Sequence, residues 1–259
     1  HVIGIDAANG HQQWERQFIA TGRTITHDKM CNATPTMASD GQRVFAFFSS
    51  NDLICLDLAG NLQWMRGLGS EFPNASNSLG MASSPVVVGS TVVVQVESDA
   101  ESFACGVDAE SGVTIWQIDR PHAANWTSPS ILQATDHQPA LVLLQSSKGL
   151  TAVDPVSGTI AWDFDKGAST IPSATVDAGS VVIPSNGLTA IRPGADNKFE
   201  LLWNSSEINP ATSSPIVANG LAFALNKGGV LSAGDAGTGE RLWQLRLRAH
   251  SAVLQSLPT

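Results

Sequence analysis

Short apolar runs rich in Val, Ile and Leu recur along the whole chain, and each run ends in a polar turn. Val86–Val88 and Val92–Val94 form one such pair, with Gly89–Thr91 between them. Runs of this length, bounded by Gly, Pro, Ser and Asp, predict β-strands, and no stretch shows the longer period of a helix. The pattern therefore predicts an all-β chain without helices.

One hairpin motif repeats along the sequence. An apolar strand runs into an Asp-x-x-x-Gly turn, and the returning strand carries a Trp. The Asp side chain can bond its own backbone and the Gly can adopt a positive φ, so the motif predicts a tight antiparallel hairpin. Two copies differ: Asp57 of the second copy is one residue closer to its Gly, and the fifth copy has Arg192 in place of the Asp and a longer turn. The Trp residues are spaced by 50, 52, 46, 41 and 40 positions: Trp14, Trp64, Trp116, Trp162, Trp203 and Trp243.

These spacings are typical of the blades of a β-propeller. Two further apolar runs precede each hairpin, which gives four strands per repeat. One four-stranded sheet cannot bury both of its faces, so the sheets must stack around an axis, and the repeated Trp would fill the gaps between them. We predict a single β-propeller domain over residues 1–259 with five full blades, 33–70, 82–120, 127–166, 170–205 and 212–247, and partial blades at 1–20 and 250–256.

Two arrangements are compatible with the partial blades. Either they complete one another in a six-bladed ring, or the chain is a fragment of a seven- or eight-bladed ring.

Composition narrows the function classes. The formal net charge is −9 without a basic run, which disfavours nucleic acid and anionic membrane surfaces as partners. No apolar run is long enough to span a bilayer, so we expect no transmembrane segment. The cysteines have no metal-ligand spacing; Cys55 and Cys105 lie in apolar strands, where a thiol packs as a small hydrophobe, and Cys31 lies in a polar loop.

Candidate ligand-binding residues lie in three connections between successive blades. Such connections emerge together on one face of a propeller. Their amides, imidazoles and one indole would suit a neutral polar ligand, a carbohydrate or a peptide. The alternative is that Asn and Ser only form turns and that Trp126 is an additional plug between blades. The candidates are His27, Asp28 and Asn32 in the first connection, Asn74, Asn77 and Ser78 in the second, and His122, Asn125 and Trp126 in the third.

Signals for catalysis are missing from the sequence. There is no Gly-x-Ser-x-Gly elbow and no Gly-rich phosphate loop that leads from a strand into a helix. His27, Asp28 and His122 have no spacing on one element that would support a metal site. We therefore expect no catalytic residues, no metal site and no cofactor.

The hairpins, such as AVDPVSGTIAW, closely resemble the tryptophan-docking repeats of the pyrroloquinoline-quinone-like (PQQ-like) family over nearly the whole chain. This fold hosts unrelated activities. One branch contains the quinoprotein alcohol and glucose dehydrogenases. The other contains non-catalytic extracytoplasmic propellers related to the lipoprotein of the outer-membrane barrel-assembly machinery. The Asn- and Ser-rich second connection is similar to propellers common in planctomycete-type bacteria.

The enzyme branch implies a quinone, a calcium ion, a catalytic Asp and often a disulfide between adjacent cysteines, and none of these can be matched residue by residue here. The resemblance therefore favours a non-enzymatic binding or assembly scaffold, periplasmic or otherwise extracytoplasmic, that holds a protein or glycan. The alternative is a quinoprotein-like oxidoreductase, or its remnant, that binds pyrroloquinoline quinone over the central channel.

Overall fold

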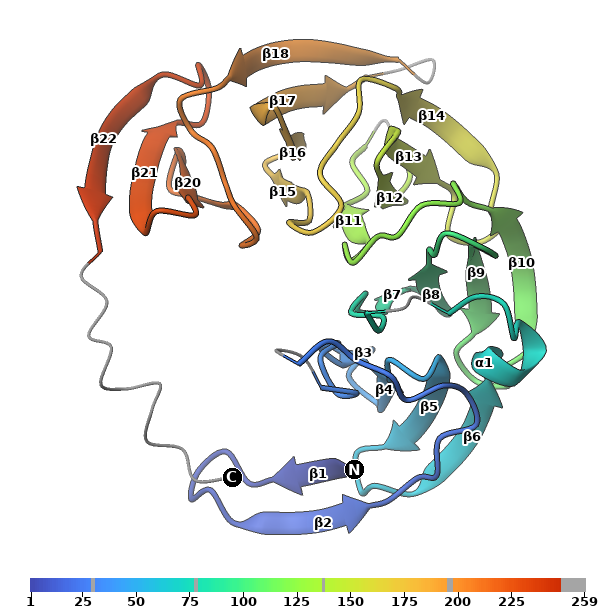
Figure 1. Ribbon diagram of the computed structural model, residues 1–259. Helices are drawn as coiled ribbons and strands as arrows, with labels where there is room; N and C mark the ends of the chain where they lie inside the picture. The colour runs from blue at the N-terminus through green and yellow to red at the C-terminus, as the bar shows by residue number, and fades with distance from the viewer. Residues whose placement is uncertain (29–30, 77–78, 137, 195–197, 248–259) are drawn as a thin grey trace. The chain divides into compact units, whose positions relative to one another are not determined.

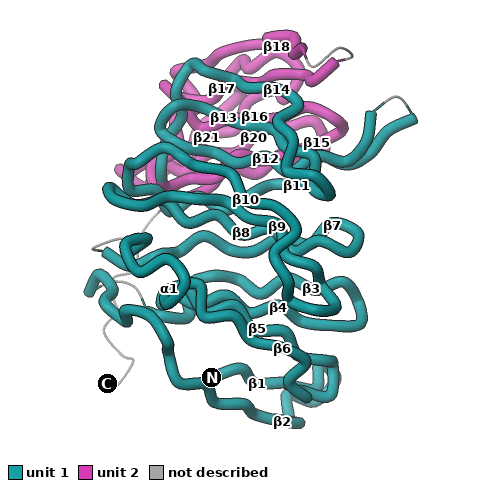
Figure 2. The backbone as a smooth tube through the Cα atoms, turned by 90° about the vertical axis from the view of Figure 1, so that its right-hand side faces the viewer, with its two compact units in different colours: residues 1–170 teal, residues 171–259 magenta. Residues whose placement is uncertain are grey.

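The computed structural model describes residues 1–28, 31–76, 79–136, 138–194 and 198–247 (Figure 1). The chain divides into two compact units, residues 1–170 and 171–259 (Figure 2). The single domain over residues 1–259 stays a prediction. The partial blade expected at 250–256 lies outside the described residues.

Unit 1 contains, within its described residues, one two-stranded hairpin followed by three four-stranded antiparallel sheets. Each four-stranded sheet is built from strands that are consecutive in sequence, because short turns pair each strand with the next. The strands are β1 (Val2–Ile5), β2 (Gln12–Arg16), β3 (Ala38–Ser39), β4 (Arg43–Phe47), β5 (Asp52–Asp57), β6 (Leu62–Gly67), β7 (Val86–Val88), β8 (Thr91–Val96), β9 (Phe103–Asp108), β10 (Thr114–Asp119), β11 (Ser130–Leu132), β12 (Leu141–Ser146), β13 (Gly149–Val153) and β14 (Ile160–Phe164).

Unit 2 contains two further four-stranded antiparallel sheets with the same consecutive order. Their strands are β15 (Thr175–Asp177), β16 (Ser180–Ser185), β17 (Gly187–Pro193), β18 (Phe199–Ser205), β19 (Ile216–Ala218), β20 (Leu221–Leu225), β21 (Val230–Asp235) and β22 (Arg241–Arg246). With the three sheets of unit 1, the predicted all-β fold of five four-stranded sheets and an N-terminal hairpin is confirmed.

One helix interrupts this pattern, so the expectation of a chain without helices is wrong at one place. Helix α1 (Leu68–Glu71) is a single turn in the connection between β6 and β7. Leu68 is fully buried, and Arg66 Nε donates a hydrogen bond to Glu71 Oε1 at 2.8 Å. Four residues are too few for the hydrophobic period by which a helix is recognised in a sequence.

The Asp-x-x-x-Gly turns have the expected geometry. In the turn that joins β13 and β14, the Asp154 carboxylate accepts hydrogen bonds from the backbone N–H of Val156 (2.9 Å) and Ser157 (2.8 Å). Gly158 has a φ of +71° and donates to the Asp154 carbonyl at 2.9 Å. The Asp thus satisfies the turn's backbone while Gly takes a conformation that a side chain would strain.

The core lies between stacked sheets within each unit. Every residue of β8 and β12 is buried, because these inner strands are covered on both faces. Phe45 and Cys55 pack with Val94 and Cys105 between the first two four-stranded sheets of unit 1. In unit 2, a corresponding cluster includes Val182, Trp203 and Ala222. Both cysteines are buried, as their strands predict, and burial raises the pKa of Cys55 to about 11 and of Cys105 to about 12.

Candidate functional site

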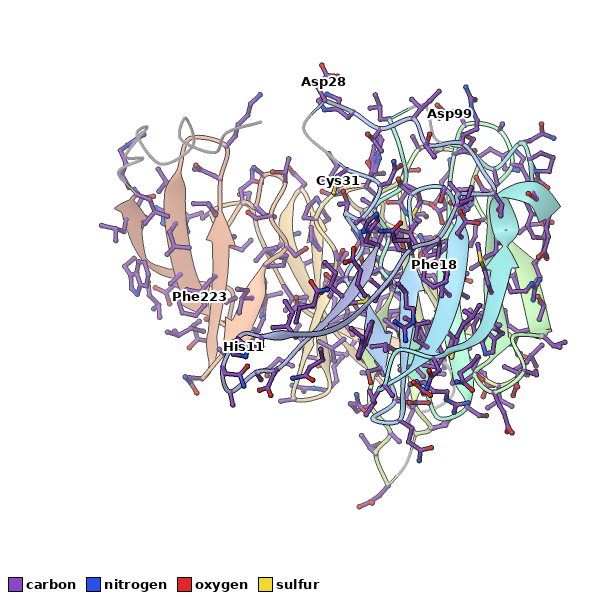
Figure 3. All side chains as sticks on the ribbon, turned by 90° about the horizontal axis from the view of Figure 1, so that it is seen from below. His11, Phe18, Asp28, Cys31, Asp99 and Phe223 are labelled. Carbon is purple, nitrogen blue, oxygen red and sulfur yellow. The ribbon has the colours of Figure 1, made fainter. Side chains whose placement is uncertain are left out.

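The connections between successive sheets of unit 1 lie at one end of the sheets, and the Asp-x-x-x-Gly turns lie at the other. Figure 3 shows Asp28, in the first connection, and Asp99, in the β8–β9 loop, at the same end, with His11 toward the opposite end. Consecutive strands of an antiparallel sheet run in opposite directions. Every second loop therefore lies at the same end of the sheet. The candidate residues that the structure describes therefore share one end of unit 1.

Hydrogen bonds join the three connections in order. The backbone N–H of His27 donates to the carbonyl of Leu79 at 2.9 Å. The next carbonyl along the chain, that of Gly80, accepts a hydrogen bond from Trp126 Nε1 at 2.8 Å. The first connection thus contacts the second, and the second contacts the third.

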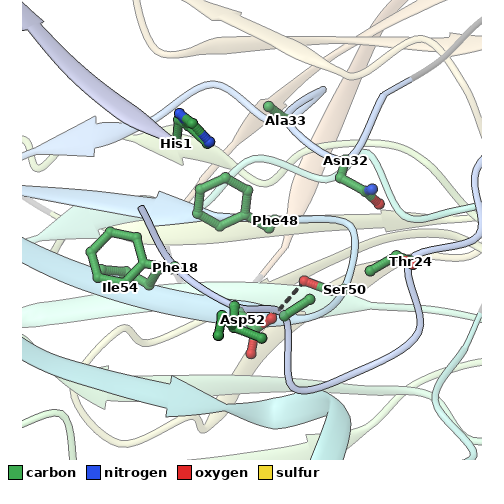
Figure 4. Close-up of a pocket in the computed structure, with 11 residues that line it drawn as sticks. His1, Phe18, Thr24, Asn32, Ala33, Phe48, Ser50, Asp52 and Ile54 are labelled. Carbon is green, nitrogen blue, oxygen red and sulfur yellow. Dashed lines mark hydrogen bonds between the residues drawn. The ribbon is translucent and has the colours of Figure 1, made fainter. Parts of the chain in front are cut away.

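A cavity of about 190 Å³ lies between the first connection and the sheet β3–β6 (Figure 4). Its apolar walls include Phe18, which follows β2, Phe48, which follows β4, and Ile54 of β5. Asn32 lies at the cavity, where its side-chain Oδ1 accepts a hydrogen bond from Ser49 Oγ at 2.6 Å. The site therefore combines two aromatic rings with a half-buried amide.

A buried carboxylate fixes the wall of this cavity. Asp52 accepts hydrogen bonds from the Thr21 backbone N–H at 3.0 Å and from Thr21 Oγ1 at 2.5 Å. It also accepts one from Ser50 Oγ at 2.6 Å (Figure 4). These bonds tie the first connection to the start of β5. Because both carboxylate oxygens are used by the protein, Asp52 is a structural anchor for the connection.

Asn125 belongs to a buried polar cluster between the second and third four-stranded sheets. It is 2% exposed, and its Nδ2 donates to Glu97 Oε2 at 2.9 Å and to the Gln145 carbonyl at 2.7 Å. Arg120 pairs with Glu97 at 2.7 Å from Nε to Oε1 and donates to the Leu144 carbonyl at 3.1 Å. The amide of Asn125 is therefore engaged within the protein and holds the third connection in place.

The environment of Glu97 has opposing effects on its pKa. Burial raises the pKa of the Glu97 carboxyl above its ordinary value, and this effect outweighs the ion pair with Arg120 and the hydrogen bonds from Asn125 and Gln95, which lower it. Sequence analysis did not single out Glu97 or Arg120. The available signal was their position, since each charged residue directly follows a strand, β8 or β10.

Trp126 is half-buried, and both its backbone N–H and its indole N–H donate hydrogen bonds. Its backbone N–H donates to the Thr170 carbonyl at 2.8 Å, and its indole N–H is bonded to Gly80. The side chain thus holds the third connection to its neighbours. A role for the indole face in stacking on a ligand stays a prediction.

The remaining candidates lie on the surface or outside the described residues. The side chains of His27, Asp28, Asn74 and His122 are exposed, and Asn77 and Ser78 are not described. Among the described residues, no group of three His, Cys, Asp or Glu side chains could hold a metal ion. No helix in the described part of the chain is long and apolar enough to cross a membrane.

Solved structures share this fold. BamB from Moraxella catarrhalis aligns with a TM-score of 0.63 and 20% identity over 82% of this chain and 61% of its own, so the chain spans less than two thirds of that protein. The computationally designed Ika8 protein aligns with a TM-score of 0.59 and 11% identity over 92% of this chain and 65% of its own.

Sequence comparison identifies the family. No curated protein matches the chain. The family model described as outer membrane protein assembly factor BamB matches residues 1–164 and 146–258, which together span nearly the whole sequence. The predicted resemblance to PQQ-like repeats is thereby confirmed, and the chain belongs to the PQQ-repeat family of the outer membrane protein assembly factor BamB.

Proposed function

We propose that this chain is a non-catalytic scaffold that holds a protein partner outside the cytoplasm. Membership of the BamB family supports an assembly role and an extracytoplasmic, periplasmic location. The observation that carries the proposal is the cavity beside Asn32, which lies at the end of unit 1 where the connections gather.

The size and chemistry of this cavity favour a side chain of a protein over a cofactor. Sites that hold small molecules typically measure about 300–1,000 Å³, whereas this cavity measures about 190 Å³. Phe18, Phe48 and Ile54 provide an apolar surface for one aliphatic or aromatic side chain. The Asn32 amide at the same cavity suits a hydrogen bond to the partner's backbone.

Binding arrays can test this proposal. The purified chain is applied to a random peptide array and to a glycan array, and hits are measured again in solution by the change in tryptophan fluorescence. We expect peptides with a large apolar residue to bind. Asn32→Ala should weaken binding by about 1–3 kcal/mol, the cost of an amide partner left unpaired. Asn74→Ala is the matched control, because Asn74 is exposed at the same end and does not line the cavity.

Three outcomes would contradict the proposal. Binding of glycans alone would replace the protein partner by a carbohydrate. Peptide binding that is insensitive to Asn32→Ala but lost in Asn74→Ala would move the site to the exposed surface. Tight binding of pyrroloquinoline quinone with calcium, together with reduction of a redox dye, would establish the oxidoreductase alternative.

A further inference from the structure

A groove of about 410 Å³ lies between the second and third four-stranded sheets, within unit 1. Its lining comes from the end of β10, from the turn between β12 and β13, and from β13 and β14. No described residue lines both this groove and the cavity beside Asn32. The groove is therefore a separate site, and its volume lies within the range of about 300–1,000 Å³ that is typical of ligand sites.

Strand alternation determines which side chains of β10 face this groove. Trp116 packs with Leu144 of β12 in the core between the two sheets. Because successive side chains of a strand point to opposite faces, Ile118 and Arg120 lie on the same face as Trp116. The hydrogen bond from Arg120 Nη2 to the Leu144 carbonyl, at 3.1 Å, agrees with this orientation.

Two side chains of the third sheet face β10 across the same gap. Thr151 is the register partner of Leu144, and Asp163 is the register partner of Thr151. Partners on antiparallel strands project to the same face of a sheet, so Thr151 and Asp163 share the face of Leu144. A carboxylate of the third sheet therefore lines the groove together with Ile118 and Arg120 of the second.

Arg120 has a hydrogen-bond donor that the protein leaves unused. Its side chain is only 4% exposed, with Nε bonded to Glu97 Oε1 at 2.7 Å and Nη2 bonded to the Leu144 carbonyl. Nη1 donates to no described residue. A guanidinium cannot accept a hydrogen bond, so a ligand that contacts this nitrogen must present an acceptor, such as a carbonyl oxygen.

Carboxylates dominate the charge of the groove. Three of them are exposed and line it: Asp119, Asp163 and Asp165. Lys148 is the only exposed cation among the lining residues, because the guanidinium of Arg120 is buried. The Asp163 carboxylate forms no hydrogen bond or ion pair with any described residue. The groove therefore favours a ligand with a positive charge.

We propose that this groove binds a Lys or Arg side chain that a protein partner presents in an extended segment. The cationic head pairs with Asp163, the aliphatic stem packs on Ile118, and a backbone carbonyl of the same segment accepts from Arg120 Nη1. The donor of Arg120 favours a peptide over a free polyamine, because a polyamine offers no acceptor to this nitrogen. The site is additional to the cavity beside Asn32 and does not depend on it.

NMR titration of the ¹⁵N-labelled full chain tests the proposal. The probes are acetyl-Gly-Lys-Gly-amide, the same peptide with norleucine in place of Lys, and butylamine, which is the Lys side chain without a peptide. We expect the Lys peptide to shift the backbone amide signals of Ile118, Thr151 and Asp163. The norleucine peptide lacks the cation and butylamine lacks the carbonyl, so each should bind at least about tenfold more weakly, as expected for one lost hydrogen bond to a charged group.

Asp163→Asn removes the charge from the groove with little change of shape. It should weaken binding of the Lys peptide about tenfold and leave the affinity for the norleucine peptide unchanged. Asp136→Asn is the matched control, because Asp136 is an exposed carboxylate of unit 1 that does not line the groove. Asn32→Ala should also leave the Kd of the Lys peptide unchanged, which separates this groove from the cavity beside Asn32.

Several results would overturn the proposal. Equal affinity for the Lys and norleucine peptides would show that the groove does not recognise charge. Equal affinity for butylamine and the Lys peptide would show that Arg120 makes no contact with a peptide backbone. Equal weakening by Asp163→Asn and Asp136→Asn would reduce the effect to the net charge of the protein, and a Lys peptide that shifts no signal of the groove would leave no site there.

Discussion

Trp126 Nε1 donates to the carbonyl of Gly80 at 2.8 Å and so joins two connections that are 46 residues apart in sequence. This bond differs from that of the repeated Trp116, whose Nε1 donates to the carbonyl of Pro155 in a hairpin turn at 2.8 Å, because Gly80 lies in a connection and belongs to no hairpin turn. The end of unit 1 that bears the connections is thus held by its own set of contacts.

Trp116→Ala should destabilise the protein more than Trp126→Ala. Trp116 fills the gap between two sheets, and emptying such a gap typically costs about 3–5 kcal/mol. Trp126 is half-buried, so its removal leaves a smaller void and allows water to reach the Gly80 carbonyl. Urea unfolding of both variants gives the comparison. Equal losses would show that the two tryptophans contribute alike to the fold.

Gly158→Ala should cost more stability than Gly41→Ala. Both residues have a positive φ, so each substitution carries the left-handed backbone cost of about 1–2 kcal/mol. Only at Gly158 does the new methyl group also meet the Trp116 ring, and this overpacking should add about 1–3 kcal/mol. Thermal melts of the two variants measure the difference. Identical melting temperatures would mean that the indole moves aside without cost.

The buried Glu97 should make stability fall as the pH rises above about 4.5, the ordinary pKa of the group. Because burial raises the Glu97 pKa in the folded protein, the folded state holds this proton more tightly than the unfolded chain does. Glu97→Gln removes that titration. Urea unfolding between about pH 4 and pH 7 should show the wild type losing stability relative to Glu97→Gln as the pH rises. A gain relative to the variant would mean that Arg120 dominates and that the pKa is lowered.

Cys31 should be the reactive thiol of the folded protein. Cys31 is exposed, whereas burial raises the pKa of Cys55 to about 11 and of Cys105 to about 12, which leaves almost no thiolate at neutral pH. Iodoacetamide labelling near pH 8, followed by mass spectrometry, should modify Cys31 in the native protein and all three cysteines in denaturant. Native labelling of Cys105 would contradict the tight packing between its sheets. Cys31→Ser is the control that should leave the native protein unlabelled.

The sheets were predictable because each contact that builds them is local in sequence. Asp154 and Gly158 determine a turn within five residues, and the turn brings two strands together without help from distant parts of the chain. The Trp spacing then gives the size of each repeat. Helix α1 escaped prediction because the burial of Leu68, which helps to hold its single turn, depends on contacts that the sequence pattern does not reveal.

The candidate site was predictable only in part. The sequence indicated which connections share one end of the sheets, since that follows from strand alternation. It did not indicate whether a polar side chain faces the solvent or the interior. Asn32 lines a cavity, whereas Asn125, which has the same residue type in a similar connection, is enclosed by Glu97 and Gln145. Whether such an amide is accessible or enclosed depends on how neighbouring sheets pack. The sequence of a single connection does not contain that information.

Four of the repeated Trp side chains, Trp14, Trp64, Trp116 and Trp203, each donate an indole N–H to a backbone carbonyl in the turn of the next repeat. The acceptors are backbone carbonyls of residues with unrelated side chains, Leu58, Ala109, Pro155 and Ala236. A duplicated or exchanged hairpin that keeps its Trp and its turn Gly therefore needs no compensating substitution at the acceptor residue of its neighbour. Genes built from such hairpins can gain or lose a blade in one recombination event, so blade number can change in evolution faster than the fold of a blade.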